Sequence, residues 1–356
     1  MINVTKTYLP PIEKYKKYVD RIYENGWVTN NGPLVRELEE RLKSYLGVDN
    51  LVLVSNGTVA LEIAYRALDI DGYAVTTPFS FVATTSSLVT NGIRPIFCDI
   101  DKDSFNIDIS KLEALITNNT SAIVPVHVFG NPCNVEAISE IATRKKIKVI
   151  YDAAHAFDVK YKNTSILNYG DISTLSFHAT KLFHSIEGGA LIFKDKKLED
   201  KVRYLINFGI KDQSNIPELG TNAKMNEFEA AMGLSVLDDI ESIKSARKVI
   251  YDKYLEGLEG FVGFQRLNSS TEINYSYFPV LFDSEAHLLK VIAKLNELGV
   301  FPRRYFYPSL DTLNYIEPKQ VCESSRNISS RVLCLPIYHG LNDIDVTQII
   351  DTIKGV

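Results

Sequence analysis

Residues 175–189 read LSFHATKLFHSIEGG: a short apolar segment, small hydroxyl residues around one lysine, and a Gly-Gly pair. The lysine is Lys181. A lysine that forms a Schiff base must be desolvated enough to lose its proton, and it must be held rigidly beside an aldehyde. The alternative is a lysine whose stem lies along the end of a buried strand while its amine stays in water. Other segments of the chain bear on this choice.

Short apolar segments alternate with helical patterns from about residue 34 to residue 240. Several are continuous Val/Ile/Leu runs, which are typical of strands covered by helices on both faces. About seven such strands with intervening helices predict an α/β fold with a doubly wound, mostly parallel sheet. Ligand-binding groups are then expected at the carboxyl ends of the strands. The predicted strands are Leu51–Ser55, Ala74–Thr77, Pro95–Asp99, Ala122–Val128, Lys148–Asp152, Thr174–Phe177 and Ala190–Phe193.

The pattern changes near residue 240. We therefore expect a large domain over residues 1–240 and a smaller α+β domain over residues 241–356. The elements predicted around and after the change are one or two long helices over Ser235–Gly260, a strand over Tyr275–Phe282, a helix over Glu285–Leu298 and a strand over Arg331–Pro336.

Composition excludes several classes of protein. The net charge is -5 and no basic stripe is present, so no nucleic-acid partner is expected. The four cysteines form no Cys-x-x-Cys and the histidines are not spaced as ligands, which argues against a metal site and favours a cytoplasmic location. No signal peptide is recognisable, and no apolar run reaches the roughly 18 residues that cross a bilayer.

Two segments that follow strands suit a flat, phosphorylated ligand. In the segment of residues 55–61, Gly57 allows close backbone approach and Thr58 begins a helix, whose free amides and hydroxyl would bind phosphate. The alternative is an ordinary helix N-cap. In the segment of residues 77–84, Phe81 would stack on a heteroaromatic ring, or it is simply a core residue.

A third segment, residues 149–157, places a carboxylate at the end of a buried strand. A buried Asp152 without a partner costs several kcal/mol, so it should face a cation such as a protonated pyridine nitrogen, or else cap the next helix. His155 would donate to a ring hydroxyl, or is a core histidine. With Ser176 and Lys181 in the fourth segment, these groups form the set that pyridoxal 5'-phosphate needs.

The chain closely resembles the DegT/DnrJ/EryC1/StrS family of sugar aminotransferases, which are pyridoxal phosphate enzymes of fold type I. The resemblance implies Lys181 as the catalytic lysine and the following cofactor contacts: Gly57, Thr58 and Ser176 to the phosphate, Phe81 and His155 to the ring, Asp152 to the pyridinium, and Asn222 to the phosphate in the neighbouring subunit. A homodimer with shared sites is therefore implied. The segments that carry the resemblance are residues 26–33, 55–58, 152–156, 176–181, 187–189, 220–227 and 335–338.

The resemblance also implies the substrates, L-glutamate and a nucleotide-linked keto-deoxysugar. Residues 182–186 and 303–310 depart from the common family pattern and resemble the branch that converts dTDP-4-keto-6-deoxy-D-glucose to dTDP-4-amino-4,6-dideoxyglucose, as in lipopolysaccharide O-antigen biosynthesis. Arg303 or Arg304 would contact the diphosphate, unless both are ordinary surface arginines. The alternatives are a 3-aminotransferase acting on a 3-keto-6-deoxysugar and a non-catalytic regulator of the same fold.

Overall fold

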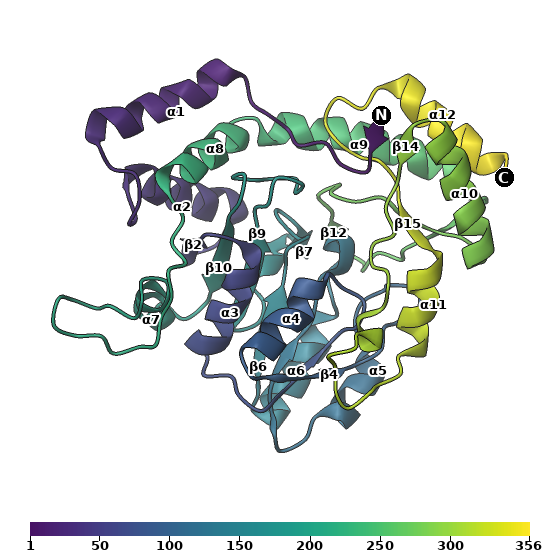
Figure 1. Ribbon diagram of the computed structural model, residues 1–356. Helices are drawn as coiled ribbons and strands as arrows, with labels where there is room; N and C mark the ends of the chain where they lie inside the picture. The colour runs from purple at the N-terminus through teal and green to yellow at the C-terminus, as the bar shows by residue number, and fades with distance from the viewer.

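The computed structural model describes residues 1–356, and a seven-stranded sheet lies at its centre (Figure 1). The strand order is β2-β10-β9-β6-β5-β3-β4; β10 is antiparallel to both neighbours and the other neighbouring pairs are parallel. The predicted mostly parallel α/β sheet is thus confirmed. Its strands are β2 (Leu51–Val54), β3 (Tyr73–Thr76), β4 (Arg94–Phe97), β5 (Thr120–Val124), β6 (Lys148–Asp152), β9 (Ile172–Ser176) and β10 (Gly189–Phe193).

Both faces of this sheet are buried. Leu51 and Leu53 belong to one core, whereas Val52 and Val54 belong to the other. Successive strand residues point to opposite faces, so two cores require an uninterrupted apolar run. The first core includes residues of α2 (Pro33–Leu46), α6 (Val135–Lys145) and α8 (Glu227–Leu237), and the second includes residues of α3 (Gly57–Ala67), α4 (Val82–Thr90) and α7 (Lys197–Leu205). The helix α1 (Ile12–Asn25) lies against α8.

A separate core forms in the C-terminal part of the chain. It includes residues of α9 (Ile240–Leu258), α10 (Glu285–Glu297), α12 (Asp343–Lys354) and a small antiparallel sheet of β11 (Gly263–Phe264), β13 (Pro279–Leu281) and β15 (Val332–Cys334). We propose the domain boundary near residue 240 because α9 begins there. The start of the chain also reaches this part, since β1 (Ile2–Asn3) pairs with β14 (Val300–Phe301) (Figure 1).

Several predicted strands are shorter in the structure, among them the strand predicted over Arg331–Pro336, which contains only β15. The strand predicted over Tyr275–Phe282 contains only β13; Tyr275 has a φ of 57°, outside the β region, and residues 275–278 belong to no strand. The strand predicted over Ala122–Val128 ends at Val124, since Pro125 has no N–H to donate to a ladder. None of the helices, including α11 (Glu323–Arg331), has the length and apolarity of a membrane span.

Candidate active site

A cavity of about 740 Å³ lies between the carboxyl ends of β6 and β9 and the C-terminal part of the chain. The structure brings seven of the eight predicted site residues together around it. The C-terminal part contributes four further lining residues, Tyr277, Arg303, Tyr305 and Phe306. The seven predicted residues are Gly57, Thr58, Phe81, Asp152, His155, Ser176 and Lys181.

One side of the cavity is the start of α3. Asn56 caps this helix, since its side chain accepts the N–H of Val59 at 2.9 Å. Gly57 and Thr58 are the first two helical residues, so their N–H groups have no partner within the helix. Ser176 stands opposite: a Cβ on Gly57 would lie 2.7 Å from the Ser176 Cβ. The helix begins one residue earlier than predicted and Thr58 is not its cap, which leaves amides and hydroxyls available to an anion.

Asp152 is buried at the end of β6. Its Oδ2 accepts the hydroxyl of Thr84 at 2.7 Å, and its Oδ1 accepts the N–H of Ala154 at 3.2 Å. Burial raises the pKa of the carboxyl group, while these two hydrogen bonds and the charge of Lys181 oppose the shift. No helix follows directly, so the capping alternative is wrong. A bound cation would stabilise this carboxylate.

His155 is buried beside two aromatic rings, in a cluster of three nearly parallel rings. Its ring lies nearly parallel to those of Phe129 and Phe306, at centroid distances of 6.2 and 5.5 Å. Its Nδ1 accepts the N–H of Phe129 at 3.3 Å, which leaves the proton on Nε2. Burial holds the pKa of His155 well below its ordinary value, so the ring is neutral at pH 7. His155 therefore provides the cavity with a neutral N–H donor, its Nε2–H group.

Lys181 follows β9, and its amine donates to the hydroxyl of Tyr277 at 3.1 Å. Burial lowers the pKa of this amine to about 8, against the opposing effects of Asp152 and Tyr305. A substantial fraction of Lys181 is then neutral near physiological pH, which is what a nucleophilic or basic lysine needs. The amine lies in the cavity and not in bulk water. Tyr277 lies 96 positions further along the chain, and no local sequence pattern predicts its contact with Lys181.

The two candidate arginines differ in their surroundings. The Arg304 guanidinium pairs with Glu285 at 2.6 Å and donates to the carbonyl of Ser330 at 3.0 Å. Arg303 lines the cavity and forms no ion pair within the chain. Phe81, with 53% of its surface exposed, lines the cavity and is not a core residue.

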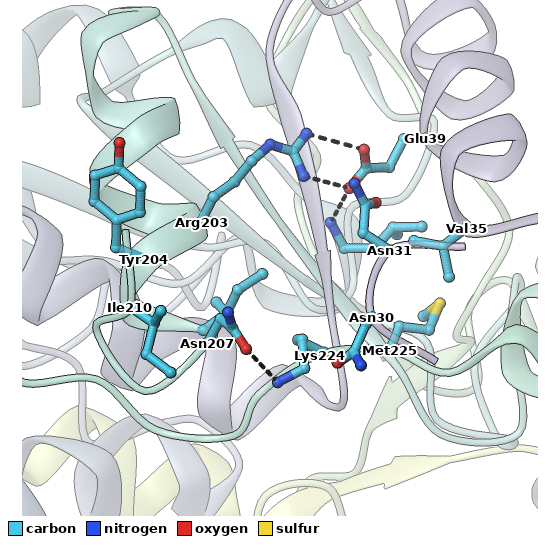
Figure 2. A pocket seen from close by; sticks show the side chains of 12 residues that line it. Asn30, Asn31, Val35, Glu39, Arg203, Tyr204, Asn207, Ile210, Lys224 and Met225 are labelled. Carbon is cyan, nitrogen blue, oxygen red and sulfur yellow. Dashed lines mark hydrogen bonds and ion pairs between the residues drawn. The ribbon is translucent and has the colours of Figure 1, made fainter. Parts of the chain in front are cut away.

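Asn222, the eighth predicted residue, is exposed and does not line this cavity. It accepts a hydrogen bond from the amine of Lys224 at 2.9 Å, and Lys224 also donates to Asn207 at 2.8 Å. Lys224 and Asn207 line a second cavity of about 370 Å³ (Figure 2). On another side of that cavity, Arg203 pairs with the buried carboxylate of Glu39 at 3.0 Å.

The main cavity therefore combines five features: an anion-binding site at the start of α3, a buried carboxylate, a neutral N–H donor, an exposed aromatic ring and a lysine of lowered pKa. This set fits pyridoxal 5'-phosphate: an anionic phosphate, a protonated ring nitrogen, a ring oxygen and an aldehyde each meet a suitable group. Fold and site together define a pyridoxal phosphate-dependent aminotransferase.

Comparisons with known proteins agree. The DegT/DnrJ/EryC1/StrS aminotransferase family matches residues 12–354, and the chain belongs to this family of pyridoxal phosphate-dependent sugar aminotransferases. It is 42% identical to the dTDP-4-amino-4,6-dideoxy-D-glucose transaminase of Shigella dysenteriae, over 100% of this chain and 99% of that protein. Identity with the Escherichia coli transaminase of the same name is 40%, over 99% and 98%. The crystal structure of DesI with its TDP-sugar product superimposes with a TM-score of 0.94, at 32% identity, over 99% and 92% of the two chains.

Proposed function

We propose that this protein transfers the amino group of L-glutamate to dTDP-4-keto-6-deoxy-D-glucose and forms dTDP-4-amino-4,6-dideoxy-D-glucose. The observation that carries the proposal is the Lys181 amine of lowered pKa in one cavity with the buried Asp152 carboxylate. The substrate is supported by the two transaminases that the chain matches over 99% and 98% of their length. A cytoplasmic location and a part in O-antigen biosynthesis stay predictions.

Each site residue has one task in this proposal. Bound pyridoxal phosphate supplies an aldehyde and an electron-withdrawing ring. Asp152 would stabilise the protonated ring nitrogen by its negative charge. The Nε2–H group of His155 would donate a hydrogen bond to the ring oxygen. Lys181 holds the cofactor and, when its amine is free, moves the proton of the donor Cα. The remaining four residues bind the phosphate and cover the ring: Gly57, Thr58, Ser176 and Phe81.

Arg303 is proposed to bind the diphosphate of the nucleotide sugar. Apart from Lys181, it is the one lysine or arginine that lines the cavity, and its guanidinium fork suits phosphate oxygens. Arg303→Ala should weaken nucleotide-sugar binding by roughly tenfold or more. Arg304→Ala is the matched control, because that side chain is held by Glu285. Equal affinities for the two variants would remove Arg303 from the site.

A homodimer with shared sites is the proposed assembly. It is supported by the exposure of Asn222 outside its own cavity, and by exposed apolar side chains nearby in the chain, Phe208, Ile210 and Leu219. Lys181→Ala and Asn222→Ala subunits should each be impaired alone. After random 1:1 mixing, about a quarter of the sites should be intact, since half of the dimers are mixed and one site in each has both residues. No recovered activity would contradict shared sites.

The proposed reaction is tested with purified protein, pyridoxal phosphate, glutamate and the 4-keto sugar nucleotide. Wild-type protein should form an amino sugar, and Lys181→Ala should fold normally and form none. Substantial turnover by Lys181→Ala would contradict the role given to this lysine. A cofactor spectrum that glutamate leaves unchanged would favour a non-catalytic regulator.

A further inference from the structure

Tyr277 is the only residue that forms a hydrogen bond with the Lys181 amine. Its ring meets the ring of His155 edge to face, at a centroid distance of 4.7 Å and an angle of 61°. Burial raises the pKa of the Tyr277 hydroxyl, which therefore stays protonated and neutral. One side chain thus contacts two residues of the candidate site, although it comes from a distant part of the chain.

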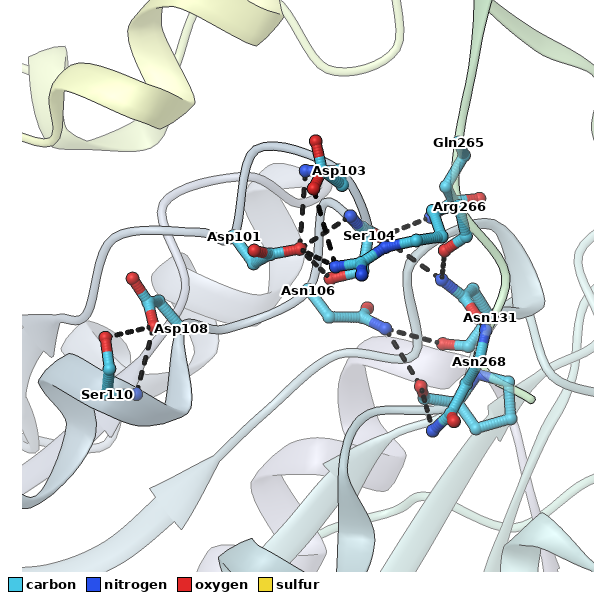
Figure 3. Close-up of polar contacts among 11 residues, drawn as sticks. Asp101, Asp103, Ser104, Asn106, Asp108, Ser110, Asn131, Gln265, Arg266 and Asn268 are labelled. Carbon is cyan, nitrogen blue, oxygen red and sulfur yellow. Dashed lines mark hydrogen bonds and ion pairs between the residues drawn. The ribbon is translucent and has the colours of Figure 1, made fainter.

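We call the segment of residues 265–277 the strap. It contacts the N-terminal part of the chain that contains the seven-stranded sheet, which we call the large sheet domain, at several points. Figure 3 shows the first group of contacts: Arg266 pairs with Asp101 at 3.2 Å, and the N–H of Asn268 donates to Asn131 at 2.8 Å. Further along, β12 (Thr271–Glu272) pairs with β7 (Lys160–Tyr161), which also pairs with β8 (Thr164–Ser165). These contacts fix the strap beside the loop that carries His155.

Asn274 makes the last hydrogen-bonded connection to the large sheet domain before Tyr277. Its side chain is buried, with 1% of the residue's surface exposed. The Nδ2 group donates to the carbonyls of His155 at 3.0 Å and Phe157 at 2.7 Å, and Oδ1 accepts the N–H of Ser276 at 3.1 Å. A single amide therefore joins the backbone beside Tyr277 to the backbone of His155, and satisfies three buried polar groups.

We propose that Tyr277 is a positioning residue for Lys181 and that Asn274 sets the place of Tyr277. The inference rests on the proposed aminotransferase function. A lysine amine on four rotatable bonds, inside a wide cavity, needs a fixed partner to stay within reach of the atom whose proton it moves. A phenol oxygen that accepts one N–H supplies this partner without adding a charge. The strap holds that oxygen in place.

The first test is Tyr277→Phe, which keeps the ring and removes only the hydroxyl. The spectral change on adding glutamate to the cofactor-loaded protein should slow by roughly ten- to a hundredfold, the loss of one hydrogen bond to a charged or reacting group. The KM for glutamate should stay within about twofold, because the hydroxyl positions the Lys181 amine and does not bind glutamate. Tyr275→Phe is the matched control: its ring lies 5.4 Å from that of Tyr251 and its hydroxyl forms no hydrogen bond to Lys181.

A second readout needs neither cofactor nor substrate. The rate at which an acylating reagent modifies Lys181 is followed against pH in the cofactor-free protein by mass spectrometry. The wild-type midpoint is expected near pH 8. Tyr277→Phe should move it to lower pH, since the phenol oxygen that accepts the N–H favours the charged amine. A protein whose spectrum never responds to glutamate would refute the proposed function, while this titration would still test Tyr277.

The part played by Asn274 is tested by a double-mutant cycle. Asn274→Ala should slow the glutamate step although its side chain touches neither Lys181 nor the cavity. If Asn274 acts through Tyr277, the double variant should be little slower than Tyr277→Phe alone. Fully additive losses would overturn the positioning role of Asn274. A Tyr277→Phe variant with an unchanged glutamate step and an unchanged midpoint would overturn the whole inference.

Discussion

Thr84→Val removes one hydroxyl from the candidate site and changes almost no volume. Thr84 is fully buried, and its Oγ1 donates to Oδ2 of Asp152 at 2.7 Å. Ser80 lies 2.7 Å from the same hydroxyl and would lose its partner too. The variant therefore removes one of the two hydrogen bonds that favour the ionised form of the buried carboxylate, together with the partner of Ser80.

The expected loss of pyridoxal phosphate affinity follows from the type of hydrogen bond that is removed. A hydrogen bond to a charged group contributes about 1.5–3 kcal/mol, so its loss should weaken pyridoxal phosphate binding by roughly ten- to a hundredfold. The direction in which folding stability changes with pH follows from the raised pKa of Asp152. In the cofactor-free protein, the native state binds the Asp152 proton more tightly than the unfolded state. Stability from this group therefore falls as pH rises through the window above the ordinary value of 3.8, and Thr84→Val extends that window upward.

The assay is a titration of cofactor-free protein with pyridoxal phosphate by absorbance, together with urea unfolding at pH 4 and pH 7. Thr85→Val is the matched control, because Thr85 is equally buried on the same helix and its hydroxyl has no hydrogen-bond partner. That variant should be neutral or slightly stabilising. If Thr84→Val and Thr85→Val bound the cofactor equally well, the role assigned to Asp152 would be wrong.

Three other perturbations have defined outcomes. Gly57→Ala should weaken cofactor binding, since its Cβ would lie 2.7 Å from that of Ser176; Gly263→Ala, whose nearest contact is 3.4 Å, should not. The rate at which an acylating reagent modifies the Lys181 amine of the cofactor-free protein should be half-maximal near pH 8 and not near 10.5. Glu227→Ala should destabilise the protein to urea by about 2–5 kcal/mol. The substitution removes the carboxylate that accepts two buried N–H groups at the start of α2, at 2.8 and 2.9 Å. An unchanged unfolding midpoint would contradict this prediction.

The sheet could be predicted from the sequence because burial on both faces leaves a strong local signal. Strands such as Leu51–Val54 are apolar at every position, since alternate residues belong to different cores. The cavity residues of the large sheet domain could also be predicted, because their places follow from the strands. Asp152 and Ser176 each end a parallel strand, and the carboxyl ends of such strands meet at one edge of the sheet.

The C-terminal contribution to the cavity left no comparable local signal. Tyr277 falls within the predicted strand Tyr275–Phe282, but it lies before the start of β13 at Pro279, and its contact with Lys181 depends on the strap. The choice between Arg303 and Arg304 likewise depends on Glu285, which lies on a separate helix. Contacts of this kind are set by tertiary packing, which periodicity and spacing do not encode.

The position of the transferred nitrogen tests the central claim most directly. The protein is incubated with pyridoxal phosphate, ¹⁵N-labelled glutamate and dTDP-4-keto-6-deoxy-D-glucose, and the sugar product is examined by NMR. We predict a ¹⁵N atom bonded to C4 of the sugar. A product that carries nitrogen at C3, or no amino sugar from a protein whose cofactor spectrum responds to glutamate, would contradict the proposed substrate.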